Sequence, residues 1–191
     1  MRVIPFALAL AFASLPVTAQ STVVFTASVG TPQAVPDPLF PANPDGNSSL
    51  FGIFSPAAGG NPATLRFILN GLPSSYGSAS PVTQETLYFM LDFGTSSLPG
   101  APLLGGLVYL PMTAPATFTV AASSYMGPLD TVPMGGTSGG VQDPLNNGGR
   151  LDLSGLLVPA AIGVPLTIQA GLFDPVPNLL FTSNAIDFQV Q

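Results

Sequence analysis

The chain lacks most of the side chains on which catalytic and metal sites depend. Its 191 residues include no histidine, cysteine, tryptophan or lysine, and Glu85 is the only glutamate. Without histidine or lysine, neither a Ser–His–Asp nor a Ser–Lys arrangement can form. Zinc and copper lose their usual nitrogen and sulfur ligands, so only carboxylate and carbonyl oxygens remain as candidate ligands. These absences exclude most nucleophilic and transition-metal chemistry.

Charged side chains are also scarce. Three arginines and nine acidic residues give a formal net charge of −6 at pH 7. No basic patch is present that would favour nucleic acid or an anionic lipid surface. After the first 19 residues, the chain has no long apolar run of the kind that spans a bilayer as a helix. We therefore expect no nucleic-acid partner and no membrane span.

The first 19 residues have the features of a secretory signal peptide. Arg2 gives a positive start to an apolar run. Val17 and Ala19 are small residues at positions −3 and −1 of a cleavage site before Gln20. The run is too short for a membrane-spanning helix of about 20 residues. We expect the mature chain to be secreted, to the periplasm, the cell surface or the extracellular medium.

An alternation of apolar and polar residues with a period of two dominates the rest of the chain. Turn signals rich in glycine, proline and asparagine separate the alternating runs, and no stretch has a strong helical period. The sequence therefore predicts an all-β fold, an antiparallel β-sandwich of about eight or nine short strands. The expected strands are Thr22–Val29, Leu50–Phe54, Leu65–Leu69, Leu87–Phe93, Leu107–Leu110, Thr117–Ala122, Arg150–Ser154, Leu166–Leu172 and Ile186–Val190.

The expected domain organisation has three segments. Residues 1–19 form the signal peptide. Residues 20–60 contain one or more N-terminal strands and a proline-rich loop, and we expect them to belong to the same domain as residues 61–191, the main β-sandwich. A chain of this length can bury a core without disulfide bonds.

The motifs from about residue 61 onward occur in a familiar order. They are Gly71-Leu72-Pro73, the stretch Phe93–Gly100, Gln169-Ala170, Asp174-Pro175 and the stretch Asn178–Ala185 before a last strand. Their order resembles that of a C-terminal β-sandwich module found in many secreted bacterial proteins, over about residues 61–191. The resemblance implies an extracellular all-β accessory module, and it brings no catalytic residue with it.

One stretch offers oxygen ligands for calcium. Asp37, Asn43, Asp45 and Asn47 supply carboxylate and amide oxygens close together in a loop, the ligand type that calcium prefers. Their spacing differs from that of an EF-hand, and the bidentate glutamate of that motif is missing. An ordinary turn is therefore the alternative interpretation. No other cofactor is expected.

The stretch Asp92-Phe93-Gly94 is close to the Asp-Thr-Gly motif of aspartic proteases. Those enzymes need two carboxylates that share a proton, each in a glycine turn, and this chain has no second copy of the motif. We interpret it as a strand end followed by a turn. We expect no catalytic residue, with a hydrolase that uses aspartates from different loops as the least favoured alternative.

The two terminal strands are candidates for self-assembly. Val23 and Phe25 in the first strand and Ile186 and Phe188 in the last are apolar. A strand at a chain end can add to the sheet edge of another subunit. The alternative is that both strands pair within their own domain. The expected partner is the chain itself or another surface or extracellular protein.

Together these patterns favour a secreted, non-catalytic β-sandwich that acts by binding or by extracellular or surface assembly. A carbohydrate- or surface-binding module is the alternative. Against that alternative, the chain has no tryptophan and only four tyrosines that could stack on a sugar.

Overall fold

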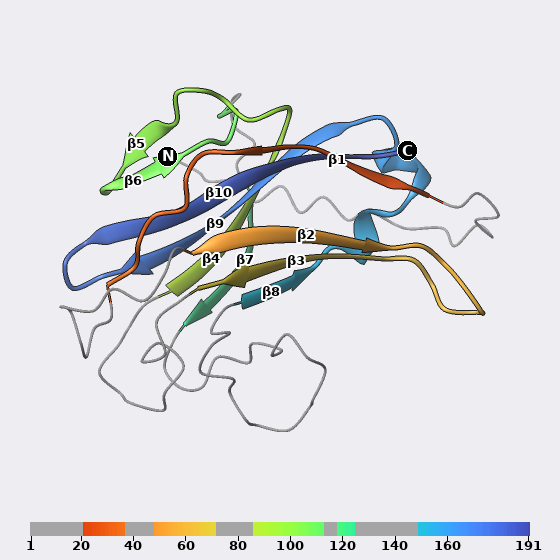
Figure 1. The fold of residues 1–191 in the computed structure, drawn as a ribbon, viewed down its shortest axis with the longest axis horizontal. Helices are drawn as coiled ribbons and strands as arrows, with labels where there is room; N and C mark the ends of the chain where they lie inside the picture. The colour runs from red at the N-terminus through yellow and green to blue at the C-terminus, as the bar shows by residue number, and fades with distance from the viewer. Residues whose placement is uncertain (1–20, 37–47, 72–85, 113–117, 125–148) are drawn as a thin grey trace, which may run out of the picture.

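The computed structural model describes residues 21–36, 48–71, 86–112, 118–124 and 149–191 (Figure 1). These residues form antiparallel β-strands and two 3₁₀ turns, with no α-helix among them, which confirms the all-β prediction. The strands are β1 (Val23–Val29), β2 (Ser49–Ser55), β3 (Thr64–Asn70), β4 (Thr86–Phe93), β5 (Ala101–Leu103), β6 (Gly106–Val108), β7 (Phe118–Ser124), β8 (Gly149–Asp152), β9 (Pro165–Asp174) and β10 (Leu179–Val190).

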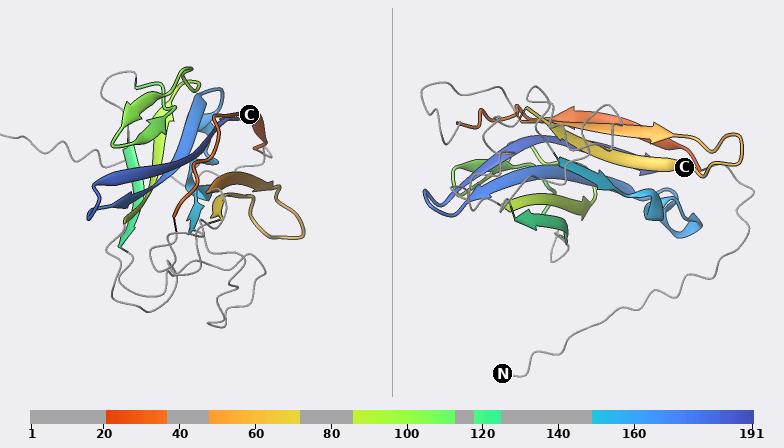
Figure 2. Two further views of the ribbon diagram at one scale, coloured as in Figure 1. Left: turned by 60° about the vertical axis from the view of Figure 1, so that its left-hand side comes forward. Right: turned by 90° about the horizontal axis from the view of Figure 1, so that it is seen from below.

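The strands are arranged in three sheets. A five-stranded sheet has the order β1-β10-β9-β4-β7, a three-stranded sheet has the order β2-β3-β8, and β5 and β6 form a hairpin. The three-stranded sheet and the hairpin lie on opposite sides of β9 and β10 (Figure 2). The five-stranded sheet is therefore the middle layer of the described structure.

One apolar core joins the two larger sheets. Alternate residues of β3 point into it, while Arg66 between them points away, as the period-two pattern predicts. The rings of Phe67 on β3 and Phe188 on β10 lie 5.0 Å apart between centroids, and Phe25 on β1 lies 6.2 Å and 6.5 Å from them. Burying a large apolar side chain contributes about 1.5–3 kcal/mol, so this cluster stabilises the contact between the sheets.

The other face of the five-stranded sheet is polar, although it is also buried. Asp92 on β4, Thr167 on β9 and Asp187 on β10 lie next to one another in register. All three side chains are buried. The β5–β6 hairpin and the segments beside it cover this face through hydrogen bonds to its side chains. A buried face can be polar where its donors and acceptors are paired.

The structure differs from the predicted strands in two places. The described residues form ten strands rather than eight or nine, because Ala101–Leu103 forms β5 without any alternation that would have revealed it. β10 begins at Leu179 rather than at Ile186, because a bulge at Ser183 and Asn184 interrupts the alternation. Two 3₁₀ turns, Ser154–Leu156 and Pro159–Ala161, lie between β8 and β9.

The predicted N-terminal segment shares its sheets with the predicted main segment. β1 pairs with β10, and β2 pairs with β3. The described part of residues 20–60 therefore contributes a strand to each of the two larger sheets. The predicted signal peptide, residues 1–19, lies outside the described residues.

Candidate functional site: a groove between two sheet edges

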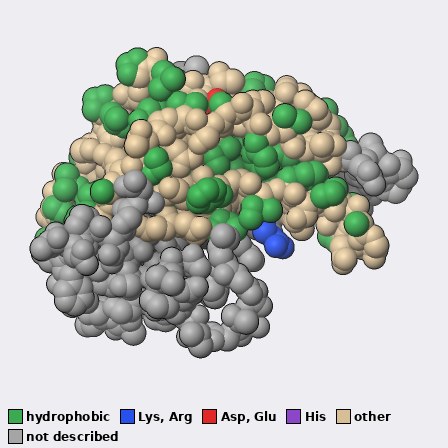
Figure 3. Space-filling view, viewed as in Figure 1, with side chains coloured by type: hydrophobic (Ala, Val, Ile, Leu, Met, Phe, Trp, Pro, Cys, Tyr) green, Lys and Arg blue, Asp and Glu red, His purple; other side chains and the backbone are tan. Residues whose placement is uncertain are grey.

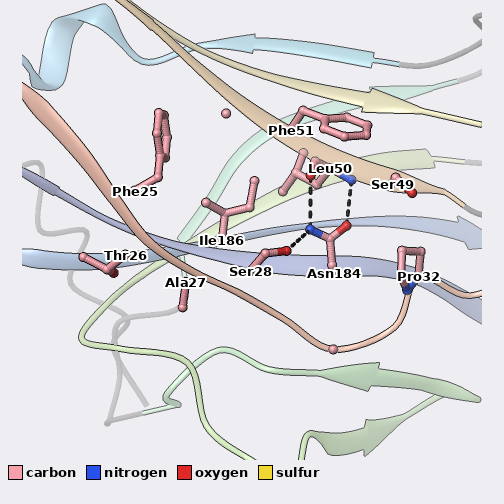
Figure 4. A pocket seen from close by; sticks show the side chains of 12 residues that line it. Phe25, Thr26, Ala27, Ser28, Pro32, Ser49, Leu50, Phe51, Asn184 and Ile186 are labelled. Carbon is pink, nitrogen blue, oxygen red and sulfur yellow. Dashed lines mark hydrogen bonds between the residues drawn. The ribbon is translucent and has the colours of Figure 1, made fainter.

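β1 and β2 are edge strands, each at the end of its sheet. An open groove of about 650 Å³ lies between them. Side chains of β10 lie between the two strands in this groove (Figure 4). The lining residues are Phe25, Thr26, Ala27, Ser28, Gly30, Pro32, Ser49, Leu50, Phe51, Gly52, Asn184 and Ile186.

The groove is apolar and carries no charge. None of its lining residues has an ionisable side chain. Phe25 is 38% exposed and Phe51 is 49% exposed, and Ile53, next along β2, is 42% exposed. Figure 3 shows hydrophobic side chains gathered along β2 and in the strip between β1 and β2. Contiguous exposed apolar surface of this kind is typical of an interaction site.

Asn184 connects the two edge strands at one end of the groove. Its Oδ1 accepts a hydrogen bond from the Leu50 N–H at 2.8 Å, and its Nδ2 donates to the Leu50 carbonyl at 3.1 Å and to Ser28 Oγ at 2.9 Å (Figure 4). The side-chain amide thus takes the place of a neighbouring strand at Leu50. The bulge in β10, where Ser183 and Asn184 both lie opposite Ala170, places this side chain between the sheets.

Gly52 makes room for the ring of Phe25. A Cβ atom at Gly52 would lie 2.3 Å from a ring carbon of Phe25, closer than two carbon atoms can approach. Phe25 can therefore pack over β2 only because Gly52 has no side chain. Phe25 also contacts Phe67 edge to face, so its ring forms both a wall of the groove and the margin of the core.

The two edges differ in regularity. β1 has a bulge between Phe25 and Ala27, whereas the register of β2 with β3 is continuous from Ser49 to Ser55. A bulge twists an edge strand and disrupts its ladder, which discourages the addition of another strand. β2 is therefore the more regular of the two edges.

The structure brings together the four residues predicted for self-assembly. β1 and β10 pair with each other, with Phe25 opposite Phe188, which matches the alternative of pairing within one domain. Val23, Ile186 and Phe188 are buried. Phe25 is the one of the four that is substantially exposed, and Ile186 reaches the groove beside it.

The predicted calcium ligands Asp37, Asn43, Asp45 and Asn47 lie outside the described residues. Within the part of the chain that the structure describes, no group of three or more His, Cys, Asp or Glu side chains is placed to hold a metal ion.

The carboxylate of Asp92 holds backbone in place. Its Oδ1 accepts the Phe93 N–H at 2.8 Å and its Oδ2 accepts the Met112 N–H at 3.0 Å, and the residue is fully buried. Asp187 likewise accepts hydrogen bonds from Thr167 Oγ1 and from both the N–H and the hydroxyl of Ser96. Both carboxylates attach loops to the polar face of the five-stranded sheet.

Comparisons with protein-family models, with curated proteins and with solved structures found no match. Among the described elements there is no helix with the length and apolar character needed to cross a membrane.

The sequence patterns did not reveal Leu50, Gly52 or Asn184 as parts of the site. The signal that was available is an asparagine inside a strand-like segment, in Ser183-Asn184-Ala185, where an unpaired polar side chain would be costly unless it met a partner.

Proposed function

We propose that this protein is an exported, non-catalytic β-sandwich that binds an extended polypeptide strand in the groove between β1 and β2. The main support for strand binding is the uncharged groove at which two sheet edges meet. The shared core of the two larger sheets supports the sandwich architecture. The leader sequence and the resemblance of residues 61–191 to a secreted module support export.

The chemistry of the groove favours a strand over other ligands. Sheet edges recognise extended peptides through backbone hydrogen bonds, and pockets for alternate side chains add selectivity. A charged side chain in this groove would lose its hydration without gaining a charged partner. The proposed ligand is therefore an uncharged strand with apolar residues at alternate positions.

Among the described residues, Tyr109 and Asp92 give no comparable support to the other two functional classes. The ring of Tyr109 is buried against Gly30 and Gly100, so it offers no platform for a sugar. Asp92, the candidate for carboxylate catalysis, has each oxygen engaged with a backbone N–H. We therefore do not propose a carbohydrate-binding or hydrolytic activity.

Binding can be tested with a fluorescently labelled seven-residue peptide of alternating valine and threonine. Fluorescence anisotropy should show saturable binding to the unmodified protein. Gly52→Asp places a charge in the groove, and it should weaken binding at least tenfold. Val176→Asp is the matched control, because Val176 is 83% exposed and does not line the groove. Equal affinity of the two variants would refute binding in this groove.

Export can be tested separately by expressing the full chain in a bacterium. The exported fraction should contain a protein whose intact mass corresponds to Gln20–Gln191. Retention in the cytoplasm with residues 1–19 still attached would contradict the proposal of a cleaved leader.

A further inference from the structure

Within the described residues, β2 lacks the charges, prolines and bulges that usually protect an exposed sheet edge. Its sequence, SLFGIFS, has no charge and no proline, and its ladder with β3 has no bulge. Phe51 and Ile53 are large, apolar and about half exposed. Proteins commonly protect edge strands with charges, prolines or bulges, because an unprotected edge accepts another strand. The question is therefore which strand β2 accepts.

The backbone of β2 determines the register of an added strand. The N–H and C=O of Leu50 point away from β3, since both bond to Asn184. In an antiparallel ladder the backbone N–H and C=O groups of successive residues point alternately toward and away from the neighbouring strand. The N–H and C=O of Gly52 and Phe54 therefore also point away from β3. They face no other strand of the described sheets.

A second copy of β2 meets these requirements. Consider an antiparallel pair in which Gly52 lies opposite Phe54 of the copy. The N–H and C=O of Gly52 then bond to the C=O and N–H of that Phe54, and the two-fold symmetry gives the same two bonds between Phe54 and Gly52 of the copy. Leu50 then faces Pro56 of the copy. Proline has no N–H to donate, and the backbone groups of Leu50 are already bonded to Asn184. This register therefore needs no hydrogen bond between Leu50 and Pro56.

The side chains are complementary in the same register. The two-fold axis passes through Ile53, so Ile53 meets Ile53 of the copy on the exposed face. On the opposite face Phe54 lies opposite Gly52 of the copy, next to the ring of Phe25 that packs over that glycine. Apolar pairs directly across an antiparallel ladder stabilise it.

Acidic side chains do not oppose the pairing. Arg66, across from Ile53, is the single charged residue in β2 and β3. The buried carboxylates Asp92 and Asp187 hold other segments. Two copies that meet at β2 therefore bring no acidic side chains of these strands together, despite the overall charge of −6.

The length of β2 limits the strength of the contact. Seven residues span about 23 Å, so one strand pair buries less than the roughly 1,600 Å² of a standard stable interface. A dimer formed in this way should dissociate on dilution.

We infer that β2 pairs antiparallel with β2 of a second copy about a two-fold axis at Ile53. The pairing joins the three-stranded sheets of two molecules into one sheet. The inference rests on the proposed function, and it identifies a second copy of this chain as the strand that the groove edge accepts.

Cysteine cross-linking tests the register. The chain contains no cysteine, so one introduced thiol reports on one position. Ile53→Cys places two Cα atoms about 4.5 Å apart across the axis, within the range of a disulfide bond. Phe51→Cys is the matched control on the same strand and face, where the two sites lie about 13 Å apart along the ladder. On oxidation, the Ile53 variant should form covalent dimer at least tenfold faster.

Light scattering over a range of concentrations tests the association itself. The unmodified protein should approach twice its monomer mass at high concentration. Ile53→Lys opposes two like charges at the axis and should remain monomeric. Leu103→Lys removes a similarly exposed apolar residue from β5, and it should behave as the unmodified protein does. Circular dichroism confirms that each variant is folded.

The outcomes separate this inference from the proposed function. A monomer at every concentration, or equal cross-linking at positions 51 and 53, would overturn the β2 pairing. If the labelled peptide still binds in that case, the groove proposal stands alone. If position 53 cross-links selectively and no peptide binds, the pairing stands and the peptide-binding proposal fails.

Discussion

The two faces of the five-stranded sheet are both buried, but by different chemistry. One face packs against the three-stranded sheet through apolar side chains around Phe67 and Phe188. The other face lies under the β5–β6 hairpin and the segments beside it. Asp92, Gln169 and Asp187 on this face bond to the segments beside the hairpin, and Gln169 also bonds to Leu107 in β6. The first contact depends on the burial of apolar surface, and the second depends on a small number of hydrogen bonds.

The difference has a consequence for stability. Apolar contacts are distributed over many residues, so the two large sheets should unfold together. The hairpin is attached through individual hydrogen bonds, and a small apolar cluster of Val108, Leu110 and Leu180 supports it. Segments with few buried apolar contacts open locally at lower free energy than the whole domain. We therefore expect the hairpin to open separately.

The largest expected effect comes from the apolar face. Phe67→Ala removes a fully buried ring that contacts Phe25 and Phe188, and it should lower the free energy of unfolding by about 3–5 kcal/mol. Chemical denaturation with urea measures this change. Phe93→Ala is the control, because Phe93 is 49% exposed and its loss should cost much less. Similar losses for both variants would show that the core does not lie at Phe67.

A somewhat smaller effect is expected at Gln169. Its Oε1 accepts the Tyr109 N–H at 2.9 Å, and its Nε2 donates to the carbonyls of Leu107 and Ser183 at 2.9 Å and 2.8 Å. Gln169→Leu leaves three backbone groups without partners, and we expect a loss of about 3 kcal/mol.

The distribution of this effect distinguishes the two faces. Hydrogen exchange in the Gln169→Leu variant should accelerate most at the amides of residues 106–110. In the Phe67→Ala variant it should accelerate throughout both large sheets. A uniform acceleration in the Gln169 variant would contradict a hairpin that opens locally.

Asp187→Asn tests the charge on the polar face. The carboxylate accepts three hydrogen bonds, from Ser96 N, Ser96 Oγ and Thr167 Oγ1, at 2.9 Å, 2.8 Å and 2.7 Å. Asparagine keeps the shape but replaces one acceptor with a donor, so the expected loss is about 1–2 kcal/mol. Asp174→Asn is the control, since that side chain bonds to Val176 N in an exposed turn. Thermal unfolding should separate the two variants.

The smallest effect is expected where the two large sheets meet at their edges. Gly52→Ala places a methyl group against the ring of Phe25, which is 38% exposed and can turn outward. We expect a loss of about 1 kcal/mol, at the low end of the range for overpacking. A loss as large as that of Phe67→Ala would indicate that the groove wall is part of the rigid core.

The sequence predicted most of this fold because its strands alternate clearly. The observed bounds of β3, β4 and β9 lie close to the predicted ones, since each has one apolar face toward the core. It did not predict the start of β10, because the bulge at Ser183 and Asn184 breaks the period. It did not predict β5, whose three residues are too few to show a period.

The candidate site was much less predictable. Phe25 and Ile186 were identified from their place in terminal strands, and both line the groove. Gly52 and Asn184 were not, because their roles depend on residues far away in the chain: Gly52 accommodates the ring of Phe25, and Asn184 bonds to the backbone of Leu50. The local pattern of apolar and polar residues does not indicate a contact of this kind.

The sequence by itself determined the all-β class, the positions of most strands and the scarcity of catalytic side chains, because period and composition are local properties. The tertiary structure alone decided which strands became sheet edges and which polar side chains were buried. Edge position depends on the order in which distant strands pair. Burial of Asp92, Gln169 and Asp187 depends on the hairpin and the segments beside it, so both features arise from contacts between segments that are remote in sequence.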